Sequence, residues 1–201
     1  MKKYSESEID KLFNIETCLF DNSKEDANHR AYEPTPYAVL DLLIDSGFIL
    51  SDDNIVDMGA GKGRVGFYLS NKIGCHVTGI EYDKDIYALA LNNLSKVVKN
   101  VNVTFLNETA EKYSIKENDT IFFFFNPFSD KILSKVIHNI EESFYEVNRE
   151  IKLIFYYPTL EFVGKLISND MLEFVDEIDC SHLYHDSKGR ECVMIFKVRQ
   201  D

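Results

Sequence analysis

An acid followed by three evenly spaced glycines marks the part of this chain that could bind a ligand. Asp57 stands near the end of a short apolar run, and Gly59, Gly61 and Gly63 follow at every second position. Glycine lets the backbone turn where a Cβ atom would clash, and the residues after Gly63 have helical spacing. A ligand at such a turn meets bare backbone N–H groups and a helix N-terminus, so we interpret this stretch as a nucleotide site.

Two patterns of glycine spacing are present, and the acid separates them. Gly61, Gly63 and Gly66 satisfy the letters G-x-G-x-x-G of dinucleotide-binding proteins, which taken alone is a weak match. That pattern leaves Asp57 unexplained, because burying a carboxylate costs several kcal/mol unless something pairs with it. A bound cation would supply the missing partner.

The stretch from Asp57 to Gly63 resembles the first motif of the class I S-adenosylmethionine-dependent methyltransferases, acid-x-Gly-x-Gly-x-Gly, and the resemblance extends from about Tyr32 to the C-terminus. In that family the glycine turn passes under the methionine part of the cofactor, and the acid orients its ammonium group. The family's second motif is an acid ending the next strand, which Glu81 matches at close to the spacing of about 20 residues for a ribose-binding carboxylate. Dinucleotide-binding proteins share that acid, so Glu81 supports the pocket without choosing between the two families.

The resemblance places the adenine at the end of the third strand. An Asp before a small residue often meets the adenine amino group in the family, but Thr109 stands at that position here, so Asn107, Glu108 and Thr109 all remain candidates. Tyr82 is placed to pack on the ring, although a tyrosine there can equally pack at a strand edge. The cofactor-binding residues that we expect are Tyr37, Asp57, Gly59, Ala60, Gly61, Gly63, Glu81, Tyr82, Asn107, Glu108 and Thr109.

Asn126, Pro127 and Phe128 follow the fourth strand and partly resemble the N/D-P-P-Y/F motif of methyltransferases that act on planar nitrogens. In those enzymes the Asn or Asp oxygen and the adjacent carbonyl accept hydrogen bonds from the target amino group, and the aromatic ring packs on its plane. Carried over, Asn126 would position an N–H acceptor, the Pro127 carbonyl could help, and Phe128 would stack. The second proline is missing, and the alternative is a strand end where Pro127 stops the ladder and Phe128 joins the core.

Alternating strand and helix patterns must position these residues, and they predict a single α/β domain of the Rossmann-like methyltransferase type. We expect a seven-stranded, mostly parallel sheet with an antiparallel last strand, helices on both faces, and the ligand at the carboxyl ends of the strands where strand order reverses. The strands are predicted at 55–58, 77–80, 101–106, 120–125, 152–157, 172–178 and 191–198, and the helices between them at 64–69, 84–98, 129–147 and 160–168.

Residues 1–31 are expected to form a helical and loop appendage to a cofactor-binding domain of residues 32–201. Ser5 and Glu8 have the spacing of a capping box at the start of a short amphipathic helix. A polar, loop-like stretch follows at 21–30. Thr35 can then cap a helix whose first position is Pro36, and this segment either only starts that helix or folds over the cofactor, with Tyr32, Thr35 or Tyr37 near the methionine end.

The net charge of −12 argues against a broad phosphate-binding surface, so we expect a small molecule or a protein as the acceptor and consider nucleic acid less favoured. The first residues do not resemble a signal peptide, and the longest apolar run, 121–125, is far too short to span a bilayer. These features predict a cytoplasmic protein with no membrane partner.

Two other motifs are considered and set aside. Cys180, His182 and His185 are close in sequence, but no fourth ligand is evident and no metal site is expected. Tyr184 and Lys188 spell the Y-x-x-x-K of short-chain dehydrogenases, yet they lie in a polar connection rather than a helix. Methyl transfer is thus the predicted function, and the alternatives are a non-catalytic S-adenosylmethionine-binding regulator and an NAD-dependent oxidoreductase.

Overall fold

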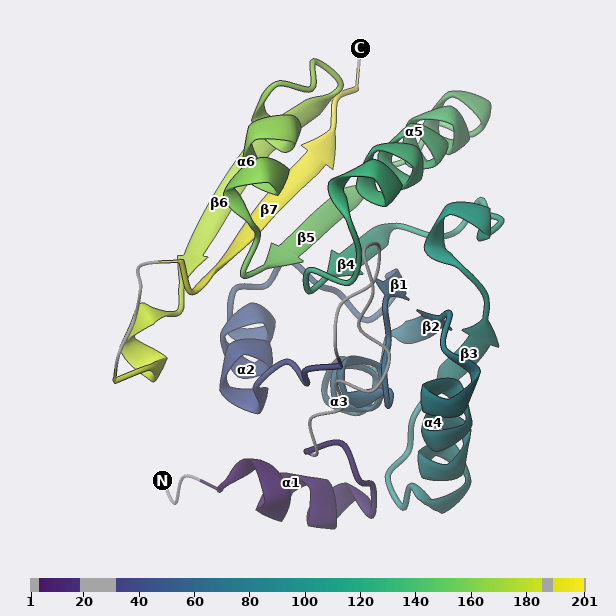
Figure 1. The fold of residues 1–201 in the computed structure, drawn as a ribbon, viewed down its shortest axis with the longest axis vertical. Helices are drawn as coiled ribbons and strands as arrows, with labels where there is room; N and C mark the ends of the chain where they lie inside the picture. The colour runs from purple at the N-terminus through teal and green to yellow at the C-terminus, as the bar shows by residue number, and fades with distance from the viewer. Residues whose placement is uncertain (1–3, 19–31, 186–189, 201) are drawn as a thin grey trace.

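A computed structural model describes residues 4–18, 32–185 and 190–200 of the chain. A central sheet carries helices on both faces (Figure 1). The strands are β1 (Asn54–Met58), β2 (His76–Glu81), β3 (Val103–Asn107), β4 (Ile121–Phe124), β5 (Lys152–Tyr156), β6 (Leu172–Asp179) and β7 (Cys192–Val198). The helices are α1 (Glu6–Phe13), α2 (Tyr37–Asp45), α3 (Arg64–Ile73), α4 (Lys84–Lys96), α5 (Asp130–Glu146) and α6 (Leu160–Ile167), with short 3-10 turns η1 (Ala110–Lys112) and η2 (Ser181–Leu183).

The strands of the described chain lie in the order β3-β2-β1-β4-β5-β7-β6. Strands β1 to β5 pair in parallel with one another, whereas β7 runs antiparallel to both β5 and β6. The predicted fold class is therefore confirmed. The chain moves outward from β1 to β3 on one side and returns to β4 on the other, so strand order reverses between β1 and β4.

Alternating side chains of the strands fill two separate cores. In β4, Ile121 and Phe123 face one core while Phe122 and Phe124 face the other, as the two-residue period of a strand requires. Helices α2, α3 and α4 cover the first face and α5 and α6 the second (Figure 1). Burial on both faces explains why β4 is a continuous apolar run in the sequence.

Residues 4–18 pack on the first of these faces. The predicted capping box is confirmed, because the Ser5 side chain accepts from the Glu8 N–H and the Glu8 carboxylate accepts from the Ser5 N–H at 2.7 Å. Phe13, at the end of α1, packs on Tyr68 of α3 with ring centroids 5.8 Å apart. The first turn and the last residue of α1 are thus both fixed by specific contacts.

The prediction that Thr35 caps the next helix was wrong. Helix α2 begins at Tyr37 with Pro36 as its N-cap, and no side chain caps it. The Thr35 carbonyl instead accepts a hydrogen bond from Arg64 at 3.2 Å, because this segment lies against the start of α3. The predicted polar stretch at 21–30 lies outside the described residues. No helix in the described ranges is long and apolar enough to cross a membrane.

Candidate active site

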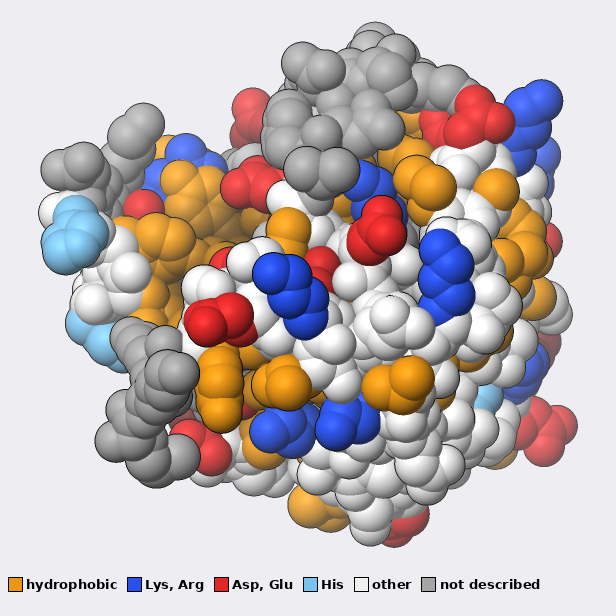
Figure 2. Space-filling model, turned by 90° about the horizontal axis from the view of Figure 1, so that it is seen from below, with side chains coloured by type: hydrophobic (Ala, Val, Ile, Leu, Met, Phe, Trp, Pro, Cys, Tyr) orange, Lys and Arg blue, Asp and Glu red, His pale blue; other side chains and the backbone are white. Residues whose placement is uncertain are grey.

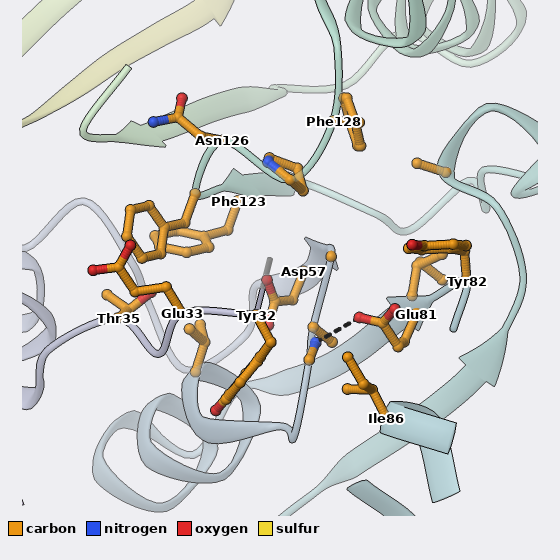
Figure 3. Close-up of a pocket in the computed structure, with 18 of the residues that line it drawn as sticks. Tyr32, Glu33, Thr35, Asp57, Glu81, Tyr82, Ile86, Phe123, Asn126 and Phe128 are labelled. Atoms are coloured by element: carbon orange, nitrogen blue, oxygen red, sulfur yellow. Dashed lines mark hydrogen bonds between the residues drawn. The ribbon is translucent and has the colours of Figure 1, made fainter. Parts of the chain in front are cut away.

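A cavity of about 410 Å³ opens at the carboxyl ends of the central strands, where strand order reverses. It has the size and position expected of a ligand site in an open α/β sheet. Figure 3 shows Asp57 of β1 near its centre, with Tyr32 to Thr35 on one side and Glu81 and Tyr82 on the other. The predicted site residues that line it are Asp57, Gly59, Ala60, Gly61, Glu81, Tyr82, Glu108, Asn126, Pro127 and Phe128.

The glycine turn connects β1 to α3 and forms one wall of the cavity. The N–H groups of Gly59 and Ala60 both donate to the Ile80 carbonyl, at 3.0 and 2.9 Å, which ties the turn to β2. Gly59 and Gly61 have φ values of 103° and 56°, a region that disfavours residues with a Cβ. A Cβ at Gly61 would lie 2.3 Å from a ring carbon of Tyr32, so the turn also needs glycine for space.

Asp57 is a buried acid without a complete set of partners. The side chain is 3% exposed, and its Oδ2 has no hydrogen-bond partner among the described residues. Burial, followed by the nearby Glu81 carboxylate, raises the pKa of Asp57 from 3.8 to about 7. A cationic group in the cavity would supply the partner that this carboxylate lacks.

Glu81 ends β2 and points back toward the turn. Its Oε2 accepts from the Gly61 N–H and its Oε1 from the Asp83 N–H, each at 2.9 Å. Two backbone donors therefore fix the orientation of the carboxylate. Figure 3 shows Glu81 beside the cavity. Glu81 of the second motif therefore contacts the glycine turn of the first motif directly.

Of the residues after β3, some line the cavity and others bind backbone groups. Glu108 lines the cavity, whereas Asn107 does not, because its amide donates to the carbonyls of Glu81 and Tyr82 at 2.8 and 3.0 Å. Thr109 is also absent from the lining. Glu111 of η1 is a lining residue that sequence reasoning missed, and its buried Oε2 has no hydrogen-bond partner among the described residues.

Asn126 follows β4 with a positive φ of 41°, and Tyr157 follows the neighbouring β5 with a φ of 50°. Such conformations are uncommon outside glycine and occur preferentially at functional sites. The Asn126 Nδ2 donates to the Tyr157 carbonyl in a very short contact. Since only the NH₂ group can donate to a carbonyl, the Asn126 Oδ1 must point the other way, and it has no partner among the described residues.

Pro127 and Phe128 have contacts in both the cavity and the protein interior. Pro127 lies beside the glycine turn, because a Cβ at Gly59 would approach its Cβ to 2.4 Å. Phe128 lines the cavity but is 5% exposed and packs edge to face on Phe124, with ring centroids 6.2 Å apart. Asn126 and Phe128 point in different directions in Figure 3.

Tyr37 and Gly63 do not line the cavity. Tyr37 is 1% exposed, and its hydroxyl donates to Asp10 at 2.6 Å, on the side of α2 that faces α1. Gly63 is the N-cap of α3, and its φ of 90° lets the turn lead into the helix. Within the same segment as Tyr37, it is Tyr32 and Thr35 that reach the cavity.

Several cavity residues carried no signal in the sequence. Glu33, Arg64 and Arg190 come from separate segments, and Tyr157 follows a strand that no motif marks. The Arg190 guanidinium lies 5.2 Å from the centre of the Tyr157 ring, so a charged side chain borders the Asn126 corner of the cavity. A positive φ cannot be read from a tyrosine in a sequence, which is why Tyr157 was not predicted as a neighbour of Asn126.

Comparisons with known proteins agree with this geometry. Residues 55–144 match the family model described as "Methyltransferase domain", a range that includes the glycine turn, Glu81 and Asn126. Residues 55–144 thus lie in an S-adenosylmethionine-dependent methyltransferase domain. S-adenosylmethionine is the cofactor of this family. No curated protein sequence matches the chain significantly.

Solved methyltransferases share the fold of this domain. An RNA methyltransferase from Salinibacter ruber, in complex with S-adenosyl-L-homocysteine, has 18% sequence identity and a TM-score of 0.60, covering 84% of this chain and 95% of that one. The putative methyltransferase yhhF from Escherichia coli has 18% identity, a TM-score of 0.61 and coverages of 84% and 89%. The N-methyltransferase NodS from Bradyrhizobium japonicum WM9 has 12% identity, a TM-score of 0.60 and coverages of 82% and 94%.

The chemistry of the cavity fits this cofactor. S-adenosylmethionine has a cationic ammonium group, ribose hydroxyls and an adenine, and the methyltransferase cavity offers an unpaired buried Asp57 oxygen, the fixed Glu81 carboxylate and the Tyr82 side chain. No group of three or more metal-binding side chains occurs within the described ranges. Tyr184 follows η2 in an extended conformation, and its supposed partner Lys188 lies outside the described residues.

Proposed function

We propose that this methyltransferase transfers a methyl group from S-adenosylmethionine to a planar nitrogen of a small molecule or a protein. The observation that carries the proposal is the orientation of Asn126. Its NH₂ group is bound to the Tyr157 carbonyl, and its Oδ1 is left as an acceptor without a partner among the described residues. An amide oxygen held in this way is suited to receive a hydrogen bond from an N–H group of the acceptor.

The cofactor half of the proposed site is built from β1, β2 and the segment after β3. Gly59 and Gly61 lie under the methionine part, Asp57 pairs with the ammonium group, and Glu81 accepts hydrogen bonds from the ribose. The fixed Glu81 and the unpartnered Asp57 oxygen support these roles. When bound, S-adenosylmethionine supplies a methyl group on a positively charged sulfur, so the protein mainly orients the acceptor and excludes water.

For the adenine we propose Tyr82 and Glu108, with Glu111 as a further hydrogen-bonding residue. All three line the cavity on the side of β2 and β3. Asn107 supports this end from behind, because its amide bonds hold the carbonyls of Glu81 and Tyr82. Neither Asn107 nor Thr109 is needed as a direct contact in this proposal.

The acceptor half lies at the ends of β4 and β5. Asn126 accepts the N–H of the target group, the Pro127 carbonyl can accept a second one, and an aromatic ring packs on its plane. Phe128 and Tyr157 both line the cavity, but Phe128 is also held edge to face on Phe124. We therefore propose that Phe128 closes the inner end of the acceptor half, where it packs on Phe124, and that Tyr157 lines its side.

The charge of the protein favours a small-molecule or protein acceptor over nucleic acid. The net charge is −12, and five of the residues lining the cavity are acidic: Glu33, Asp57, Glu81, Glu108 and Glu111. On the face shown in Figure 2, the described Lys and Arg side chains are scattered among acidic and apolar ones. A phosphate backbone is usually met by a concentrated basic surface. The likeness to an RNA methyltransferase concerns the fold, which hosts many acceptors.

The test is to incubate the protein with S-adenosylmethionine and cell extract, and to identify by mass spectrometry any species that gains a methyl group. The expected product carries the methyl on a planar nitrogen, and S-adenosylhomocysteine accumulates in step with it. Methylation of oxygen or carbon would contradict the assignment of Asn126. Tight binding of S-adenosylmethionine without any methylated product would support the alternative of a regulatory binding protein.

A further inference from the structure

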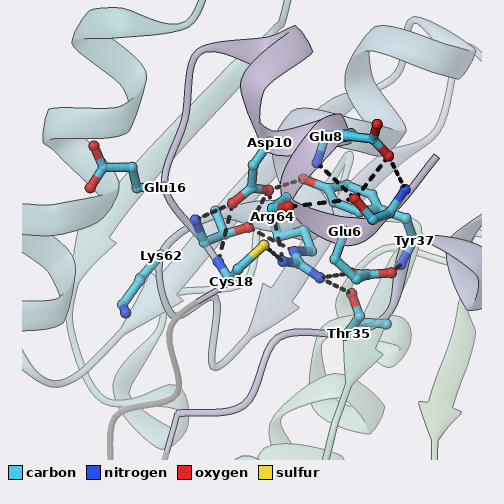
Figure 4. Close-up of polar contacts among 12 residues, drawn as sticks. Glu6, Glu8, Asp10, Glu16, Cys18, Thr35, Tyr37, Lys62 and Arg64 are labelled. Carbon is cyan, nitrogen blue, oxygen red and sulfur yellow. Dashed lines mark hydrogen bonds and ion pairs between the residues drawn. The ribbon is translucent and has the colours of Figure 1, made fainter.

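Arg64 connects the glycine turn to the N-terminal segment. It is the first residue of α3, lies directly after Gly63, and lines the cavity although it is only 3% exposed. Figure 4 shows its guanidinium group surrounded by residues of the N-terminal segment 4–18 and by Thr35. A buried cation in this position needs partners, and their identity decides what the residue does.

The partners of Arg64 come from three places along the N-terminal third of the chain. Its Nε donates to the Thr17 hydroxyl at 2.7 Å, and its Nη1 donates to the Glu6 carboxylate and to the Thr35 carbonyl. The Asp10 carboxylate lies 3.7 Å from Nη2. These contacts bring α1, the chain after α1 and the segment before α2 together at the start of α3.

Asp10 fixes the backbone after α1. Its carboxylate accepts the N–H of Thr17 at 2.6 Å, the N–H of Cys18 at 3.1 Å and the Thr17 hydroxyl at 2.8 Å. The side chain is 4% exposed, so water does not compete for these bonds. The position of the Thr17 carbonyl is therefore set by Asp10 together with Arg64.

The Thr17 carbonyl in turn holds Tyr32. It accepts the Tyr32 hydroxyl at 2.8 Å, and the Tyr32 ring lies against Gly61, where an added Cβ would be 2.3 Å from it. The Lys62 ammonium lies 4.6 Å from the centre of the same ring. Tyr32 lines the cavity, so it forms the part of the wall that a ligand on the glycine turn must meet.

We propose that Asp10 and Arg64 are positioning residues for the cofactor: they fix Thr17, and Thr17 holds Tyr32 against the glycine turn. Segment 4–18 is then an integral part of the cofactor site, although Asp10 and Thr17 do not line the cavity. This inference depends on the cofactor assignment and is independent of the acceptor. By thermodynamic linkage, a cofactor that binds better when Tyr32 is fixed must also stabilise segment 4–18.

The first test measures the affinity for S-adenosylhomocysteine by calorimetry, using folded full-length variants. Tyr32→Phe removes only the hydroxyl that Thr17 holds and should weaken binding roughly three- to tenfold. Asp10→Asn should weaken it by about tenfold or more, because Arg64 loses a charged partner and four donors lose an ionised acceptor. If Asp10→Asn does not fold, the affinity of the Tyr32→Phe variant alone decides the test.

Tyr68→Phe is the matched control. Tyr68 belongs to α3, and its partly buried hydroxyl donates to Asp41 of α2 at 2.7 Å. Tyr68 does not line the cavity, and in the described structure its hydroxyl makes no hydrogen bond to Thr17. We expect it to lower the melting temperature and to leave the affinity within about twofold of the wild type. Equal losses of affinity in Tyr68→Phe and Tyr32→Phe would overturn the proposal, because loss of any tyrosine hydroxyl in this region would then weaken binding.

The second test measures the reverse coupling by hydrogen exchange. S-adenosylhomocysteine should slow exchange of the Thr17 and Cys18 amides, which donate to Asp10, more than exchange of the Asp119 amide in a turn elsewhere. The Tyr32→Phe variant should lose this difference. Tight binding with unchanged protection of Thr17 and Cys18 would also overturn the proposal, whereas absence of binding to the wild type would instead refute the cofactor assignment.

Discussion

The Gly61 N–H donates to the Glu81 Oε2 at 2.9 Å, so the acid at the end of β2 holds the glycine turn at the end of β1. Glu81 thus has two functions in the proposed site: it shapes the turn and it accepts hydrogen bonds from the ribose. Each hydrogen bond to a charged acceptor contributes roughly 1.5–3 kcal/mol. Glu81→Ala should therefore weaken S-adenosylhomocysteine at least tenfold in a calorimetric titration. An affinity within a factor of two of the wild type would show that another residue holds the ribose.

Gly61→Ala should abolish or severely weaken cofactor binding. The new Cβ meets the Tyr32 ring and sits on a backbone with a φ of 56°. Gly74→Ala is the control, because Gly74 has a φ of 92° but open space around it and lies at the end of α3, away from the cavity. Both variants should lose stability in thermal unfolding, whereas only Gly61→Ala should lose affinity. Equal affinities would separate the turn from the site.

The raised pKa of Asp57 predicts a pH-dependent affinity. In the free protein, burial and the Glu81 charge favour the neutral carboxyl, with a pKa of about 7. A cationic ligand group favours the ionised form, so binding below pH 7 should release a proton, and affinity should rise as the pH increases toward 7 and then level off. Calorimetry in two buffers with different ionisation enthalpies counts that proton. Asp57→Asn should show weaker binding without this pH dependence.

The same raised pKa makes a prediction for stability. A carboxyl whose pKa is higher in the folded state contributes stability that is complete below its ordinary value of 3.8 and is lost as the pH rises through about 7. The free protein should therefore gain more stability from Asp57→Asn at pH 8 than at pH 4. Denaturant unfolding at the two pH values measures the difference, and an equal effect at both would contradict the assigned pKa.

Asn126→Ala should lower turnover by about 10²-fold or more with the cofactor affinity nearly unchanged, because orientation of the acceptor is the main catalytic contribution in this mechanism. The matched control is Asn71→Ala. Asn71 also donates its amide to a backbone carbonyl, that of Asn100 at 3.2 Å, but it lies outside the cavity. A fully active Asn126→Ala protein would remove Asn126 from the acceptor site.

The sequence predicted the fold because its signals are local. Each strand and helix has its own periodicity, and Gly59, Gly61 and Gly63 stand where the backbone needs a positive φ. The ends of elements differ in places: β3 begins at Val103 rather than 101, because the Asn102 N–H donates to the Ser70 hydroxyl. Asp57 and Glu81 could be assigned to the site because an acid at the end of an apolar strand is costly to bury without a partner.

The rest of the site depends on contacts between distant segments, which no local pattern encodes. Tyr37 was expected near the cofactor, but Tyr32 in the same segment lines the cavity instead, and the difference depends on Asp10 and Arg64. Arg64 looked like an ordinary helix residue and proved to be a buried cation with partners from three segments. Pairing over such distances is decided by the packed fold.

The position of β7 between β5 and β6 has a consequence for the order in which the protein becomes functional. Strand β7 follows every other strand in the chain, and β6 joins the described sheet only through it. The Tyr157 N–H donates to the Cys192 carbonyl of β7 at 2.9 Å, so the corner that holds Asn126 also depends on this strand. During synthesis the residues of the cofactor half are complete long before β7 emerges. A nascent chain therefore receives the residues of its cofactor half first and the strand that supports the acceptor corner last.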